Sequence, residues 1–405
     1  MGRATEAATP VAGPAWLQEW RRGAAEAAEH LPVPRWDRTD AAALDGAAGA
    51  GRGGEWTAVV PPGAAERGVV VGPLEVLAEQ RPDLVRRYLG HIVGPEAGRF
   101  EARNAAAHQG VLVYVPDGVA LGAPVELSFQ AGADAAQFHP RVVLGLGRTA
   151  EATVVLRQEG GPEAAGGARA TAVVEADIAD GAHLRFVDIQ NWAAGVRAYT
   201  AREARVGRDA SVRWLIGELG GALLRSGTAS DLAAPGGEAL SLLVFFASGV
   251  QHMDLATLLR HTAPRTNGHM LAKGVLAGTA RAIYRGTSDI ERGAKDSNSQ
   301  QKENVLHLDP GVRSDAIPAL FINENQLQAG HAATTGKVDQ EQLFYLASRG
   351  LPEREAMRLV VHGFFAPLLE QMPVEAARDR LEALIDHKID GESRRPPRAS
   401  HPAGK

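Results

Sequence analysis

The chain has 405 residues, no cysteine, and a formal net charge of −5 at pH 7. This length can bury a large core, whereas the lack of cysteine excludes disulfides, thiolate metal ligands and a cysteine nucleophile, so any metal site must use His, Asp or Glu. The mildly acidic charge argues against broad binding to nucleic acid or to an anionic membrane. No secretory signal opens the chain, and its longest apolar run, at 240–247, is too short to span a bilayer, so a cytoplasmic protein is expected.

Residues 1–98 are predicted to form an N-terminal helical region. A first amphipathic pattern ends at Pro32 and Pro34, which cannot continue a helix. A glycine- and alanine-rich connection follows at 41–54. A second stretch with helical spacing then runs from 73 to 92.

From 99 to 338 the apolar period changes from 3.6 to 2, which predicts a β-rich core. One phrase recurs there: a glycine, a short turn, an alanine and then alternating residues. Its copies stand at 147–150, 181–182, 207–210 and 278–280. Short strands with small residues at repeated corners, without helices between them, favour a parallel β-helix whose coils stack on one another. A β-sandwich is the alternative that the pattern alone leaves open.

At Asp339 the helical period returns, and residues 339–390 are predicted to form a C-terminal helical domain. Apolar residues recur at helical spacing between 356 and 364 and again between 374 and 385. The charged, proline-containing tail at 391–405 is predicted to be disordered.

Two patterns resemble functional motifs but lack the context that those motifs need. Residues 145–150 nearly spell a dinucleotide-binding fingerprint, yet the strand-like stretch at 153–156 follows where a helix N-terminus would hold the phosphates. A second group consists of His252, Asp254, His261 and His269. The spacing of this group fits neither a helical nor a strand zinc site, so structural or surface roles are favoured.

Two further polar features carry alternative interpretations. Residues 295–304 are dense in hydrogen-bonding side chains, which is typical of a solvated loop, of stacked polar residues at a solenoid edge, or of an interface. His331 lies among small residues at 329–333, and spacing alone favours a packed histidine over a metal ligand at an edge shared with a partner chain. No serine has a clear histidine–acid pairing, so nucleophilic catalysis is not indicated.

Several blocks of the chain follow one another in a familiar order. They lie at 280–286, 295–306, 313–320, 330–336 and 339–350. Together they resemble the SufB/SufD family of iron–sulfur cluster assembly proteins, densely from about 275 to 365 and more weakly from 100 to 129. The resemblance implies a right-handed parallel β-helix core flanked by N-terminal and C-terminal helical regions. The length and the short N-terminal region are more similar to SufD than to SufB.

The resemblance to SufD implies a non-catalytic scaffold that pairs with a SufB-like paralogue and binds a SufC-like ABC ATPase, which hydrolyses the ATP. A nascent iron–sulfur cluster would be transient and shared with the partner, while flavin binding and a homodimer of the isolated chain stay open. His331 matches the family histidine at the SufB interface, and Ala329 stands where many SufD chains have cysteine, which limits His331 to a contributing ligand. The residues that match the SufC-docking segment are Asp339, Gln342, Phe344, Tyr345, Arg349 and Gly350.

Two alternatives compete with the scaffold. A β-helix enzyme acting on polysaccharide would need catalytic carboxylates and stacking aromatics along a groove, but aromatic residues are only 5% of the chain and no carboxylate pair stands out. The SufB paralogue would be expected to carry an acceptor cysteine, and this chain has none.

Overall fold

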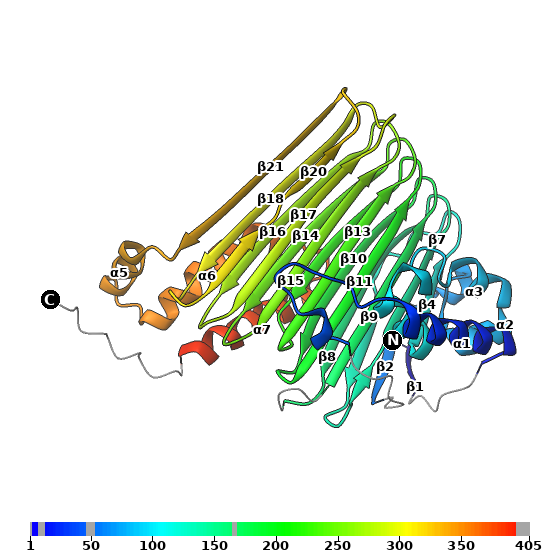
Figure 1. The fold of residues 1–405 in the computed structure, drawn as a ribbon, viewed down its shortest axis with the longest axis horizontal. Helices are drawn as coiled ribbons and strands as arrows, with labels where there is room; N and C mark the ends of the chain where they lie inside the picture. The colour runs from blue at the N-terminus through cyan, green and yellow to red at the C-terminus, as the bar shows by residue number, and fades with distance from the viewer. Residues whose placement is uncertain (1, 7–12, 46–52, 164–167, 394–405) are drawn as a thin grey trace.

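A computed structural model of the chain shows a flattened β-solenoid built from two sheets, with helices before and after it (Figure 1). The structure describes residues 2–6, 13–45, 53–163 and 168–393. Consecutive strands of the solenoid alternate between the two sheets, so each coil adds one strand to each sheet. The fold class predicted from the sequence, a parallel β-helix with flanking helical regions, is therefore confirmed.

The first sheet is antiparallel at its beginning and parallel from β5 onward. Its strands, in hydrogen-bonded order, are β1 (Gly2–Glu6), β2 (Gly54–Val60), β5 (Val125–Ala131), β8 (Glu151–Gly160), β10 (His183–Trp192), β12 (Ser211–Glu218), β14 (Glu238–Ala247), β16 (Asn267–Leu276), β18 (Ser297–His307) and β21 (Leu327–Lys337). In the parallel part, equivalent residues of successive coils pair in register, as Leu184 does with Val212. In-register parallel pairing places equivalent side chains on the same face of the sheet.

The second sheet faces the first across the interior of the solenoid. Its strands are β3 (Val70–Pro73), β4 (Gln109–Val115), β7 (Pro140–Leu146), β9 (Ala168–Ile178), β11 (Val196–Val206), β13 (Leu223–Leu232), β15 (His252–His261), β17 (Arg281–Ile290), β19 (Arg313–Ala316) and β20 (Ala319–Ile322), with the short β6 (Gln137–Phe138) beside β9. Both β19 and β20 pair with β17, and Pro318 lies in the gap between them. Because proline has no backbone N–H to donate, it interrupts the ladder at that point.

The recurring corner phrase has a direct structural role. Thr149 and Asp209 adopt left-handed conformations, with φ of 55° and 50°, and the N–H of Thr149 donates to the carbonyl of Asp180 on the next coil at 3.0 Å. The alanines that close two of these corners, Ala150 and Ala210, are fully buried. A larger side chain there would separate the coils, so the corner residues set how closely the coils stack.

The solenoid is apolar both inside and on part of its outer surface. One cluster fills the space between the sheets and contains Phe186, Trp214 and Phe245. A second cluster joins outward-facing residues of the first sheet, such as Phe246, to Phe365 and other residues of the C-terminal helices. Strands β10, β12 and β14 are therefore covered on both faces over part of their length, which explains why the apolar run at 242–247 in β14 is continuous rather than alternating.

The N-terminal region is a mixture of helices and strands. Its helices are α1 (Ala15–His30), α2 (Leu74–Gln80), α3 (Pro82–Tyr88) and α4 (Arg99–Ala107), with 3₁₀ turns at Ala41–Ala43, Ala65–Arg67 and Pro95–Ala97. The expected single helix at 73–92 is wrong: Pro82 starts a new helix, because Arg81 before it leaves the helical conformation at φ −138° and ψ 56°. Strands β2 and β3 also lie in this region and extend the two sheets. α4 occupies the first residues of the stretch expected to be β-rich.

The C-terminal region is helical, as its period indicates. It contains α5 (Gln340–Ser348), α6 (Glu353–Leu369) and α7 (Glu375–Ser393). α6 and α7 pack on the outer face of the first sheet, while α1–α3 lie toward the opposite end of the solenoid from β21 (Figure 1). The tail predicted to be disordered spans 391–405; for 391–393 this prediction is wrong, because these residues form the end of α7, and 394–405 lie outside the described residues. Among the described helices, none combines the length and the hydropathy of a membrane span.

Candidate functional site

The solenoid ends in an uncovered strand, β21. It pairs with β18 on one side and is the last strand of its sheet (Figure 1). From His331 to Lys337 every residue of β21 is exposed, and on the opposite sheet Phe321 and Ile322 are 58% and 46% exposed. A long exposed edge strand offers unpaired backbone donors and acceptors, which proteins normally cover or pair. This end, formed by β20 and β21, is here called the open end.

His331 lies on the inward-facing side of β21. It pairs in register with Gln301 of β18, and Gln301 points into the solenoid, where its amide nitrogen donates to the Ser288 hydroxyl. The imidazole therefore shares a face with buried residues of the preceding coil while remaining exposed itself. The spacing alone predicts a packed histidine, but the His331 side chain is exposed in the structure. Whether His331 binds metal stays a prediction.

A narrow cavity links His331 to the coil beneath it. Its lining combines Tyr284, Gly286, Gln301, Glu303 and Pro318 with His331 and its neighbours. Gln301 and Glu303 are each only 6% exposed. Burial raises the pKa of Glu303 to about 8, so its carboxyl holds a proton at neutral pH. The cavity therefore brings an imidazole, an amide and a carboxyl group to the open end.

Helix α5 is separated from β21 by two residues, the buried Val338 and the exposed Asp339. The Asp339 carboxylate caps its N-terminus by accepting from the backbone N–H of Glu341 at 2.9 Å. Leu343 is buried against the C-terminal cluster, whereas Phe344 and Tyr345 are 76% and 56% exposed.

The remaining residues predicted to bind a partner lie on or beside α5 and are also exposed. They are Asp339, Gln342, Arg349 and Gly350. The Arg349 guanidinium donates to the Tyr345 hydroxyl at 3.2 Å, and Gly350 ends the segment with a φ of 90°. The structure thus gathers the predicted docking residues on one short exposed helix. What they contact in a complex stays a prediction.

Asp254 and His261, two members of the group at 252–269, form hydrogen bonds or ion pairs with other residues of the fold. The buried Asp254 carboxylate accepts from Thr39 at 2.6 Å and pairs with Arg285 at 2.9 Å, while His261 shares a hydrogen bond with Thr266. Burial lowers the pKa of His261 to about 4, which keeps its imidazole neutral. Within the described residues, no three His, Asp or Glu side chains converge as a metal site would require.

The fingerprint-like segment at 145–150 forms a solenoid corner. Leu146 ends β7, the left-handed Thr149 turns the chain, and β8 follows at Glu151. The helix N-terminus that would hold a pyrophosphate is therefore replaced by a strand.

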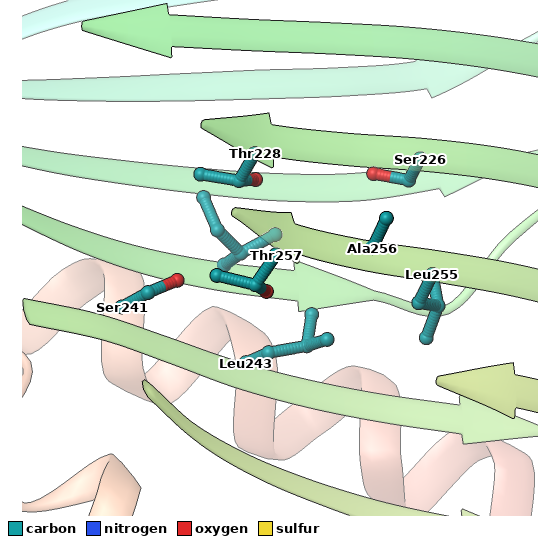
Figure 2. A pocket seen from close by; sticks show the side chains of 8 residues that line it. Ser226, Thr228, Ser241, Leu243, Leu255, Ala256 and Thr257 are labelled. Atoms are coloured by element: carbon teal, nitrogen blue, oxygen red, sulfur yellow. The ribbon is translucent and has the colours of Figure 1, made fainter. Parts of the chain in front are cut away.

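Part of the solenoid interior is polar. The fully buried Arg202 guanidinium pairs with Asp188 at 2.7 Å and with Glu218 at 2.9 Å, so the inward-facing charges compensate one another. Farther along, Figure 2 shows a small pocket in which hydroxyl groups of Ser226, Thr228, Ser241 and Thr257 accompany Leu243 and Leu255.

The sequence did not identify Gln301 and Glu303 as residues of the open end. The polar stretch at 295–304 is not a solvated loop, because from Ser297 onward it is strand β18. Ser297, Ser299, Gln301 and Glu303 point inward, which corresponds to the interpretation as stacked polar residues at a solenoid edge. The period-2 alternation of these four residues, continued by Val305, was the signal that could have found them.

The chain matches two family profiles that together cover most of the described solenoid. Residues 129–364 match "SUF system FeS cluster assembly, SufBD core domain", and residues 56–127 match "SufBD protein N-terminal region". The chain is 30% identical to the iron–sulfur cluster assembly protein SufD of Bacillus subtilis, over 80% of this chain and 75% of that protein.

Two further relatives carry the same family description. The chain is 30% identical to a SufBD family protein of Staphylococcus epidermidis, over 80% of this chain and 70% of that protein. It is 33% identical to the SufBD family protein ML0593 of Mycobacterium leprae, over 74% of this chain but only 34% of that longer protein. The chain belongs to the SufBD family of iron–sulfur cluster assembly proteins.

Proposed function

We propose that this chain is a SufD-like, cytoplasmic, non-catalytic scaffold subunit of a SufBCD-type complex. In this proposal a SufB-like paralogue covers the open end, and a SufC-like ABC ATPase binds α5 and hydrolyses ATP. The observation that carries the proposal is the succession of an uncovered terminal strand and an exposed aromatic helix. β21 offers a free backbone edge, and α5 offers Phe344 and Tyr345 directly after it.

The open end suits another β-solenoid as its partner. A paralogue with the same coil geometry can continue the ladder or face it, which satisfies the free edge of β21 and buries Phe321 and Ile322. His331 would then lie inside the interface, beside groups from both chains. Because one imidazole cannot hold a cluster alone and Ala329 supplies no thiolate, the sulfur ligands would come from the partner.

The α5 surface suits an ATPase that moves. Exposed aromatic side chains beside an arginine are typical of interface hot spots. Since only Val338 and Asp339 separate α5 from β21, displacement of α5 would reach the open end directly. This connection would couple ATP hydrolysis in the partner to opening of the cluster-assembly interface.

Co-expression with the paralogue and the ATPase tests the two surfaces separately. Thr335→Arg puts a charged side chain on the inward face of β21 and should prevent co-purification of the paralogue. Val250→Arg, at a corner position that is 86% exposed, is its matched control and should not. If both variants retained the paralogue in full, the open end would not be its binding surface.

The ATPase surface has its own matched pair of variants. Phe344→Ala combined with Tyr345→Ala should release the ATPase while the paralogue stays bound. Leu359→Ala, an exposed apolar residue of α6, should release neither partner. Retention of the ATPase by the double variant would refute docking through α5.

A further inference from the structure

One loop links the N-terminal region with the last coils of the solenoid. Residues 31–45 leave the end of α1, lie across the strands of the second sheet and return to α4; they are here called the crossing loop (Figure 1, dark blue). A single guanidinium binds both ends of the loop. Arg99 of α4 donates to the Leu31 carbonyl at 2.7 Å and to the Asp45 carboxylate at 2.8 Å. A surface loop whose ends lie close together is an Ω-loop, a class that is frequently functional.

The middle of the crossing loop contacts three successive strands of the second sheet. Trp36 stacks on Tyr199 of β11, with ring centroids 6.0 Å apart, and the Arg225 guanidinium of β13 lies 5.2 Å from the Trp36 ring. The Thr39 hydroxyl donates to the buried Asp254 carboxylate of β15 at 2.6 Å. In a solenoid each coil normally contacts only its neighbours, so a segment that spans several coils connects strands that would otherwise be independent.

The tip of the crossing loop reaches the last coil. It is a tight turn at 36–39, in which Arg38 adopts a left-handed conformation with a φ of 69°. The Asp37 carbonyl accepts from the Arg285 guanidinium of β17 at 2.5 Å. The Arg38 guanidinium pairs with the Asp315 carboxylate of β19 at 2.8 Å. Because a left-handed conformation is unfavourable for a long side chain, the turn requires such contacts to persist.

The last coil is weakly held where the Arg38 side chain meets it. β19 and β20 have only four residues each, and Pro318 lies between them. No residue of either strand is buried, and among the described strands both pair only with β17. Segments with few buried contacts open locally at a low cost in free energy. The ion pair between Arg38 and Asp315 therefore adds a contact exactly where the repeat itself supplies few.

We propose that the crossing loop orders the last coil for partner binding, with Arg38 as a positioning residue that acts through Asp315. β19, β20 and β21 follow one another in this coil, so a contact that holds β19 limits the motion of the strands at the open end. The inference rests on the proposed function for the identity of the partner, whereas the ordering of the coil is a property of the free chain. The N-terminal region thus acts on a surface at the opposite end of the solenoid.

Amide hydrogen exchange of the full-length free chain tests the ordering of the coil. Arg38→Glu places a carboxylate against Asp315 and should accelerate exchange at 313–322 by about threefold or more, while β7 and β9 keep wild-type rates. Arg38→Lys keeps the positive charge and should restore most of the protection. Arg35→Ala is the matched control, because it changes an exposed arginine of the same loop and should leave exchange at 313–322 unchanged. Unchanged exchange in Arg38→Glu would overturn the proposal.

The association kinetics of the SufB-like paralogue test the consequence for binding. If only the ordered coil is competent to bind, Arg38→Glu should slow association and leave the dissociation rate nearly unchanged, and Arg38→Lys should restore association. A thermal midpoint close to that of the wild type confirms that the variants are folded. Faster exchange with wild-type association would overturn the role of the loop in partner binding. Failure of the wild-type chain to bind the paralogue would instead contradict the proposed function and leave the exchange result standing.

Discussion

Gln301 and His331 occupy equivalent positions on adjacent parallel strands, one buried in the solenoid and the other exposed on its last coil. On the preceding coil the same inward-facing position holds Met270, so the row becomes polar only at Gln301 and reaches the surface at His331. Where another coil would normally follow, the row ends in an imidazole open to a partner. The chemistry of the open end is thus a consequence of where the repeat stops.

Glu203 should make the stability of the protein depend on pH. Burial, reinforced by the nearby negative charge of Glu101, raises its pKa from the usual 4.5 to about 7. The folded chain thus keeps a proton that the unfolded chain loses near pH 4.5, so this group stabilises the fold below that pH, and its contribution is lost as the pH rises to about 7. Glu203→Gln should therefore raise the thermal midpoint at pH 8 and leave it nearly unchanged at pH 4.

The exposed Glu238 provides the control for this effect. Glu238→Gln should shift the thermal midpoint by the same small amount at both pH values. Equal effects of the Glu203 substitution at pH 4 and pH 8 would show that burial does not raise the pKa of that carboxyl.

Asp254 should be important for stability because it compensates two arginines. Its fully buried carboxylate pairs with Arg285 at 2.9 Å and with Arg225 at 3.3 Å. Asp254→Asn would leave both guanidinium groups without a counter-charge, and we expect the free energy of unfolding to fall by about 3 kcal/mol in urea denaturation. Asp117→Asn removes an exposed, solvent-screened pair with Arg148 and should leave the free energy of unfolding nearly unchanged. Similar costs for the two variants would contradict this account.

Asp339 should hold the first turn of α5 without contributing much to the rest of the fold. Asp339→Ala removes the carboxylate that accepts from the N–H groups of Glu341 and Gln342. Loss of such a cap costs about 1 kcal/mol. Amide hydrogen exchange should accelerate within α5 while the core strands keep wild-type rates, and Asp339→Asn should restore most of the protection. Unchanged exchange in α5 of the alanine variant would show that the cap is dispensable.

The repeat and its corners were predictable because they depend on local chemistry. The glycine-to-alanine pattern predicts a turn at the corner of each coil. Thr149 and Ala150 lie at such a corner, as expected. The split between α2 and α3 was also encoded, by Pro82, but the apolar spacing across it suggested one helix. The strands β2 and β3 escaped prediction because their pairing partners lie far along the chain.

The site was only partly predictable for a related reason. His331 was identifiable through family resemblance, whereas its local sequence shows only small neighbours. Gln301 and Glu303 become meaningful only when the coil register places them beneath His331. A register between residues some thirty positions apart cannot be derived from spacing alone, since a shift of one residue would turn the same side chains outward.

Hydrogen exchange of β21 in the free chain and in the complex with its SufB-like paralogue tests the central claim most directly. The amides of β21 that do not pair with β18 face outward in the free chain and should exchange rapidly. We predict that the paralogue protects the segment from His331 to Lys337, while β5 and β8 at the far end of the solenoid keep their rates. Protection that appears elsewhere and leaves β21 unchanged would contradict the assignment of the open end as the partner interface.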